Sequence, residues 1–111
     1  NEDVLGSMEY ACKVAGSKLV LVMGHTKCGA VTSACQGVEL GNITPLLSKI
    51  KPAVEASSNI EDVDAVAKLN VEMTIDRIRK ESSILKEMED NGEIKMVGAM
   101  YSVDGGEVSF F

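Results

Sequence analysis

The stretch Lys18-Leu-Val-Leu-Val-Met-Gly24, followed by His25-Thr-Lys-Cys-Gly29, decides the fold. Its first part is a near-continuous apolar run of strand length, which is typical of a strand covered on both faces in a parallel sheet. The chain then becomes polar, and Thr26 is a plausible N-cap for a helix that would carry Cys28 in its first turn. The stretch therefore predicts a core strand that ends at a histidine and leads directly into a helix.

Hydrophobic spacing and turn residues predict the remaining elements. Ser7 can cap a helix that runs to about Ala15, and Gly16 is placed to end it. We also expect a short helix within 42–56, a longer helical region over 60–89 that breaks near 82–83, and strands over 94–103 and 107–111 joined by a turn at 104–106. Together these elements predict an α/β fold with a parallel-core sheet, helical crossovers and a C-terminal β-hairpin.

Composition narrows the class of protein. The chain has 111 residues, of which 45% are hydrophobic and 25% charged, so we expect one small domain over 1–111. Its net charge of −6 argues against a nucleic-acid partner. The longest apolar run, 19–23, is too short for a membrane span, and the acidic start does not resemble a secretory leader. Three cysteines, an odd number at low density, favour reduced thiols and a cytoplasmic location.

His25 and Cys28 are the candidate metal ligands. Imidazole nitrogen and thiolate sulfur are standard zinc ligands, and a turn at the end of a strand can direct both at one point. A helix N-terminus also favours the thiolate over the thiol. From the pattern alone, a buried helix-start cysteine beside a histidine bonded to backbone is an equally good interpretation.

The chain's other cysteines are poorly placed to complete such a site. Cys35 follows Cys28 by seven positions, which places it about 10 Å further along a continuous helix. Cys12 lies in the interior stripe of its predicted helix, so we expect both to be small core residues. Near the candidate ligands, Gly24 permits a tight exit from the strand, and Gly29 leaves its backbone amide approachable.

Four segments resemble the β-class carbonic anhydrases. Gly6-Ser-Met-Glu-Tyr-Ala11 and Lys18–Val31 are similar in order and spacing to the stretch that ends in that family's His-x-x-Cys-Gly zinc motif. Asn70-Val71 and Val97–Val108 resemble its later helix and closing strands. The resemblance covers nearly the whole chain.

The resemblance implies a zinc ion held by two cysteines and one histidine, with water or an aspartate in the last position. His25 and Cys28 match two of these ligands. The family's Cys-x-Asp-x-Arg segment, which supplies the other cysteine, the aspartate and its arginine partner, does not occur in these 111 residues. We therefore expect a chain truncated at its N-terminus and incomplete relative to the family fold, with no catalytic residue assignable in it.

The implied activity is that of a zinc lyase, carbonate dehydratase, which interconverts carbon dioxide and bicarbonate. We expect weak or no activity from this chain alone. As its partner we expect a second copy in a homodimer, further copies in a higher homo-oligomer, or the missing N-terminal segment.

One alternative is an inactive fragment or degenerate member that serves as a structural or dimerising module. Another is an enzyme with Cys28 as nucleophile and His25 as base. A cysteine phosphatase would place an arginine six residues after its cysteine, but position 34 is alanine. A thiol redox enzyme would favour a Cys-x-x-Cys motif, which does not occur in the chain.

Overall fold

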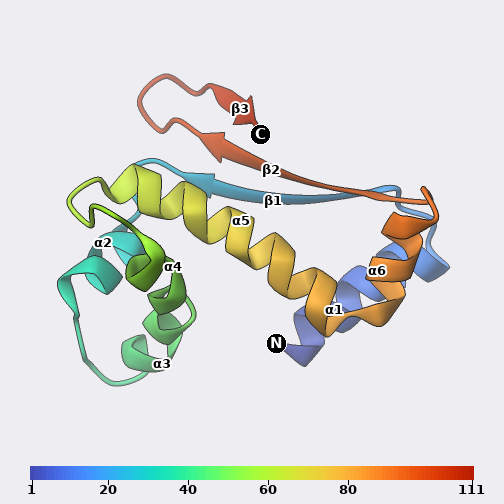
Figure 1. Ribbon diagram of the computed structural model, residues 1–111, viewed down its shortest axis with the longest axis horizontal. Helices are drawn as coiled ribbons and strands as arrows, with labels where there is room; N and C mark the ends of the chain where they lie inside the picture. The colour runs from blue at the N-terminus through green and yellow to red at the C-terminus, as the bar shows by residue number, and fades with distance from the viewer.

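The computed structural model describes residues 1–111 as a three-stranded sheet with its helices on one side (Figure 1). In chain order the elements are α1 (Glu2–Glu9), a π-helical turn η1 (Tyr10–Val14), β1 (Leu19–His25), α2 (Gly29–Gln36), α3 (Ile43–Ser48), α4 (Lys51–Ala56), α5 (Val63–Glu81), α6 (Ser83–Asp90), β2 (Lys95–Tyr101) and β3 (Val108–Phe110).

The sheet has the order β1-β2-β3 and confirms the predicted α/β class. β1 and β2 are parallel, with Leu19 opposite Lys95 and His25 opposite Tyr101. The helices from α2 to α6 form the crossover between them, and β3 then pairs antiparallel with β2. Both the parallel pair and the C-terminal hairpin agree with the sequence prediction, and β1 lies at an edge of the sheet.

The expectation that β1 is covered on both faces is wrong. Val20 is buried against α5, whereas Leu19, Leu21 and Met23 are exposed. All the helices lie on the same side of the strands (Figure 1), so nothing within the chain covers the second apolar face. An apolar run indicates that a strand can be buried on two sides, but it does not show whether any element covers the second side.

The first helix begins earlier than predicted. Asn1 caps α1, because its Oδ1 accepts a hydrogen bond of 3.0 Å from the Val4 amide. Ser7 lies inside the helix, where its hydroxyl donates to the Asp3 carbonyl at 2.7 Å. Gly16 has a φ of +84°, a conformation that glycine adopts readily, and it ends the helical segment as predicted.

The segment 42–56 forms two short helices rather than the single predicted one. Pro52 lies in the first turn of α4 and has no amide hydrogen with which to continue the turn from Ser48. α3 therefore ends at Ser48, and α4 starts at Lys51.

The break predicted near 82–83 is confirmed at Ser82, which is buried and separates α5 from α6. Its hydroxyl accepts a hydrogen bond of 3.2 Å from the Leu85 amide and donates to the Glu9 carboxylate at 2.6 Å. One serine thus caps α6 and ties it to the end of α1.

The buried side chains form two groups. One joins η1, β1, β2, α6 and the second half of α5, and comprises Cys12, Val20, Val71, Ile75, Ile78, Leu85, Met88, Ile94 and Met96. The other joins α2, α3 and α4 to the first half of α5, and comprises Val31, Leu47, Ile50, Ala53, Val66 and Ala67. α5 contributes to both groups, so the predicted apolar stripe along it is core packing.

A bidentate ion pair links α5 to α6. Arg79 donates from Nε and Nη2 to the two carboxylate oxygens of Glu89 at 2.8 and 2.9 Å. The hydrogen bond from Arg79 lowers the pKa of Glu89 below its ordinary value. The ion pair therefore contributes its full stabilisation at pH values above the pKa that Glu89 has in the unfolded chain. This stabilisation is lost as the pH falls through the lowered pKa of Glu89 in the folded protein.

We expect Glu89→Gln to reduce the free energy of unfolding by about 1 kcal/mol at neutral pH, since the pair is partly exposed. The difference from wild type should shrink as the solution is acidified. Urea denaturation at several pH values measures it. Asp90→Asn, which removes the exposed partner of Lys86, is the control and should have a smaller effect.

Candidate functional site

His25 is the last residue of β1, and its exposed ring has a defined tautomer. Nδ1 lies 2.8 Å from the carbonyl oxygen of Thr26. A carbonyl can only accept, so Nδ1 carries a proton, and in the neutral ring Nε2 keeps its lone pair. A histidine held through one nitrogen by a backbone carbonyl presents the other nitrogen to a metal.

Cys28 is the N-cap residue of α2, with extended backbone (φ −70°, ψ 118°) and no capping hydrogen bond from its sulfur. Its carbonyl accepts from the amide and the hydroxyl of Thr32 at 2.9 and 2.8 Å, which fixes the start of the helix. The half-buried thiol therefore lies at the end of α2 where amide groups are unpaired.

The predicted N-cap role of Thr26 is wrong, because the helix starts two residues later. Thr26 instead binds the hairpin: its amide donates to the Tyr101 carbonyl at 3.0 Å, and its hydroxyl accepts from the Val103 amide at 3.0 Å. These bonds join the residue between the two candidate ligands to the end of β2.

Lys27 completes the link between His25 and Cys28 and has a positive φ of 54°, which is unusual for a residue with a side chain. Its amide donates to Asp64 at 3.0 Å, and its ammonium pairs with Asp104 at 2.8 Å. The hydrogen bond to Asp104 raises the pKa of Lys27 above its ordinary value. Partners 37 and 77 residues away hold this loop, and no local sequence signal identifies them.

The two glycines of the candidate site differ in their surroundings. A Cβ atom on Gly24 would lie 2.9 Å from the sulfur of Met100 and 2.9 Å from a methyl group of Val71, so close packing requires a glycine there. A Cβ atom on Gly29 would meet no atom within 4 Å. Gly29 therefore leaves open space beside Cys28.

The other two cysteines do not reach this site. Cys12 is only 4% exposed in the core, as predicted. Cys35 packs beside the second buried group, and burial raises the pKa of its thiol. Nowhere in residues 1–111 do three or more His, Cys, Asp or Glu side chains form a cluster that could hold a metal ion. His25 and Cys28 thus offer two donors of the right chemistry but not a full ligand set.

No helix of the structure has both the length and the apolar character that a membrane span requires.

Comparison with known proteins places this chain in a family. A family model described as carbonic anhydrase matches residues 1–108. The chain is 30% identical over 110 residues to carbonic anhydrase 2 of Mycobacterium tuberculosis, covering 93% of this chain and 53% of that protein. It is 26% identical over 112 residues to a carbonic anhydrase of Mycolicibacterium smegmatis. The chain spans about half the length of the curated relatives it matches.

Solved structures share the fold. The β-carbonic anhydrase CafA of Aspergillus fumigatus superposes with a TM-score of 0.85 at 27% identity, over 100% of this chain and 56% of that one. A tetrameric β-carbonic anhydrase of Sordaria macrospora also gives a TM-score of 0.85, at 20% identity over 100% of this chain and 60% of that one. The architecture is thus a partial β-carbonic anhydrase fold. The chain belongs to the β-class carbonic anhydrase family.

Proposed function

We propose that His25 and Cys28 form half of a zinc site that serves the reversible hydration of carbon dioxide to bicarbonate. The observation that carries the proposal is the geometry of the loop between them: Nδ1 of His25 is bonded to the Thr26 carbonyl, which leaves Nε2 free three residues before the N-cap thiol of Cys28. Family membership identifies the reaction to which such a pair would contribute.

The residues of this chain would act by positioning. Bound zinc would supply Lewis acidity, which lowers the pKa of water towards about 7 and makes hydroxide available near neutrality. The Thr26 carbonyl would keep His25 in one tautomer, and the bonds of Thr26 and Lys27 to the hairpin and to Asp64 would hold the two donors at a constant separation. Residues 1–111 offer two donors, so we assign no catalytic step to a residue of this chain.

The cysteine-nucleophile alternative has less support. No hydrogen bond joins the His25 ring to the Cys28 thiol; the ring bonds to the Thr26 carbonyl instead. A histidine base needs contact with its nucleophile, directly or through one water.

The open edge of β1 supports the proposal that the chain works as part of an assembly. A strand with unpaired backbone groups and exposed apolar side chains favours association, either with a second copy in a homodimer or larger oligomer or with a further segment of protein. A structural or dimerising module without activity would use the same edge, and no feature of the site favours it over the zinc function. A cytoplasmic location agrees with three free cysteines.

The test is to measure zinc content and carbon dioxide hydration on the purified 111-residue protein. We expect weak zinc binding and slow or undetectable hydration, because two protein donors replace the three or four of a complete site. Metal analysis after dialysis and stopped-flow hydration assays give the two readouts. Tight stoichiometric zinc together with fast turnover would show that the site is complete without further ligands.

A further inference from the structure

One peptide group, between Thr26 and Lys27, contacts both a candidate ligand and a distant helix. Its carbonyl oxygen lies 2.8 Å from Nδ1 of His25 and accepts a hydrogen bond from it. Its amide, which is the backbone N–H of Lys27, donates to Oδ1 of Asp64 at 3.0 Å. The peptide thus links a carboxylate on α5 to the imidazole at the end of β1.

The orientation of this peptide is strained. Lys27 has a φ of 54°, and it is the only residue of the chain besides glycines with a positive φ. A residue with a β-carbon enters this left-handed region only at a cost in energy. Turning the peptide over would relax the strain, since the two common types of β-turn differ by such a rotation and by the sign of φ at the residue that follows. The observed orientation therefore needs a bond that the flipped peptide would lose.

The other restraints on the loop do not set this orientation. The ammonium of Lys27 pairs with Asp104, but both side chains are exposed and the ammonium ends a flexible stem, so the pair leaves the backbone free. The amide and the hydroxyl of Thr26 bond to the hairpin, and both groups lie before the peptide. Asp64 is thus the partner from outside the loop that bonds to the peptide itself.

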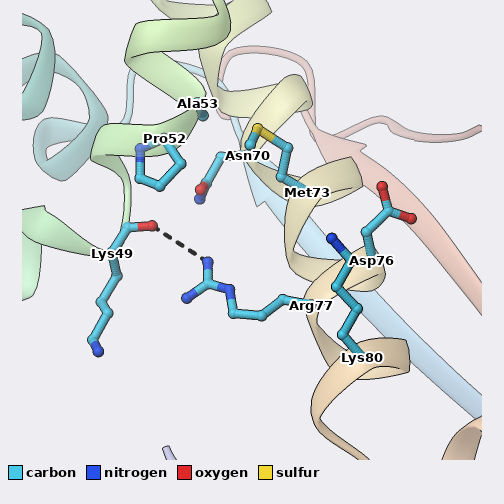
Figure 2. A pocket seen from close by; sticks show the side chains of 8 residues that line it. All are labelled: Lys49, Pro52, Ala53, Asn70, Met73, Asp76, Arg77 and Lys80. Atoms are coloured by element: carbon cyan, nitrogen blue, oxygen red, sulfur yellow. Dashed lines mark hydrogen bonds between the residues drawn. The ribbon is translucent and has the colours of Figure 1, made fainter.

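The helix α5 holds Asp64 in place. Asp64 lies in the first turn of α5, where the unpaired amides of the helix start favour a carboxylate. Asp62 caps this turn, because its Oδ1 accepts a hydrogen bond of 3.1 Å from the Ala65 amide. Further along α5, Arg77 donates to the Lys49 carbonyl at 3.4 Å and ties the helix to the α3–α4 link (Figure 2). The carboxylate therefore lies on an element that is fixed by its own contacts.

We propose that Asp64 is a positioning residue for His25 and that it acts through the peptide between Thr26 and Lys27. Its carboxylate holds the Lys27 amide, which keeps the Thr26 carbonyl directed at Nδ1 and leaves the lone pair of the neutral ring on Nε2. A negative charge at the amide also polarises the peptide and strengthens its carbonyl as an acceptor. The inference rests on the proposed function, in which Nε2 is a zinc donor.

Imidazole ¹⁵N chemical shifts measure the tautomer of His25, the only histidine of the chain, in the metal-free protein. We expect the wild type to carry the proton on Nδ1 at about pH 8, where imidazole is neutral. Asp64→Ala should release the peptide and produce a mixture of the two tautomers. The same change should raise the zinc dissociation constant by about tenfold or more, as the loss of a group that orients a metal ligand does.

Two further variants separate this role of Asp64 from a general effect of charge. Asp64→Asn keeps an oxygen that can accept from the Lys27 amide, so it should retain the Nδ1–H tautomer and a zinc affinity within about threefold of wild type. Asp104→Ala removes the exposed partner of the Lys27 ammonium and should change neither readout. Circular dichroism checks that each variant is folded.

A wild-type tautomer in Asp64→Ala, or an equal change in Asp104→Ala, would overturn the proposal. The tautomer is read without metal, so this result is distinct from a failure of the proposed function. If Asp64→Ala shifts the tautomer but the wild type binds no zinc, the control of His25 by Asp64 is supported and the zinc function is contradicted.

Discussion

Leu85→Ala is expected to reduce the free energy of unfolding by about 3–4 kcal/mol, a large part of the 5–15 kcal/mol typical of a domain of this size. Leu85 is 0% exposed and belongs to the buried group that joins η1, β1, β2, α5 and α6. Truncation removes the transfer free energy of its side chain and leaves a cavity between elements that cannot all move to fill it. Urea denaturation followed by circular dichroism measures the loss.

Ile84 is the control for this prediction, since it is the neighbouring residue on α6 and is 41% exposed. Ile84→Ala should cost about 1 kcal/mol or less, because much of its side chain already contacts water. Equal losses for the two variants would mean that α6 does not pack against the sheet as described.

Gly24→Val is expected to destabilise the protein by about 2–3 kcal/mol and to move the candidate site. The first added carbon would lie 2.9 Å from both the Met100 sulfur and a Val71 methyl group, and the branched side chain adds more atoms in the same space. Gly24 directly precedes His25, so relief of the clash must displace the end of β1. Unfolding curves and the amide shifts of residues 25–28 report the two effects.

Gly29→Ala is the matched control. The added methyl group meets open space, and alanine suits the first position of α2, so stability should stay within about 0.5 kcal/mol of wild type. Amide shifts at 25–28 should then change little. A Gly24 variant that behaves like this control would contradict the packing of β1 against α5 and β2.

The sequence predicts the parallel pair well because its signals are local. The apolar run ending at Gly24, the break at Ser82 and the turn at 104–106 all appear where expected, since glycines, a capping serine and strand periodicity act on their own neighbourhood. Helix ends were less predictable. Asn1 takes the capping role expected of Ser7, and Cys28 takes the one expected of Thr26, because several residues near each start could have served.

Two features could not be predicted because they depend on distant parts of the chain. Apolar residues at Leu21 and Met23 do not reveal whether anything covers them, and here no helix does. The loop between His25 and Cys28 is set by Asp64, Asp104 and the end of β2, whose roles exist only once the crossover has brought them together. The choice of His25 and Cys28 as candidate ligands came from spacing and family resemblance, and it remains a prediction.

A zinc titration by calorimetry on the 111-residue protein and three variants tests this assignment most directly. We predict weak binding to the wild type, a further loss of at least about tenfold in both His25→Ala and Cys28→Ser, and wild-type affinity in Cys35→Ser, which removes a thiol outside the site. Wild-type zinc affinity in His25→Ala or Cys28→Ser would contradict the account.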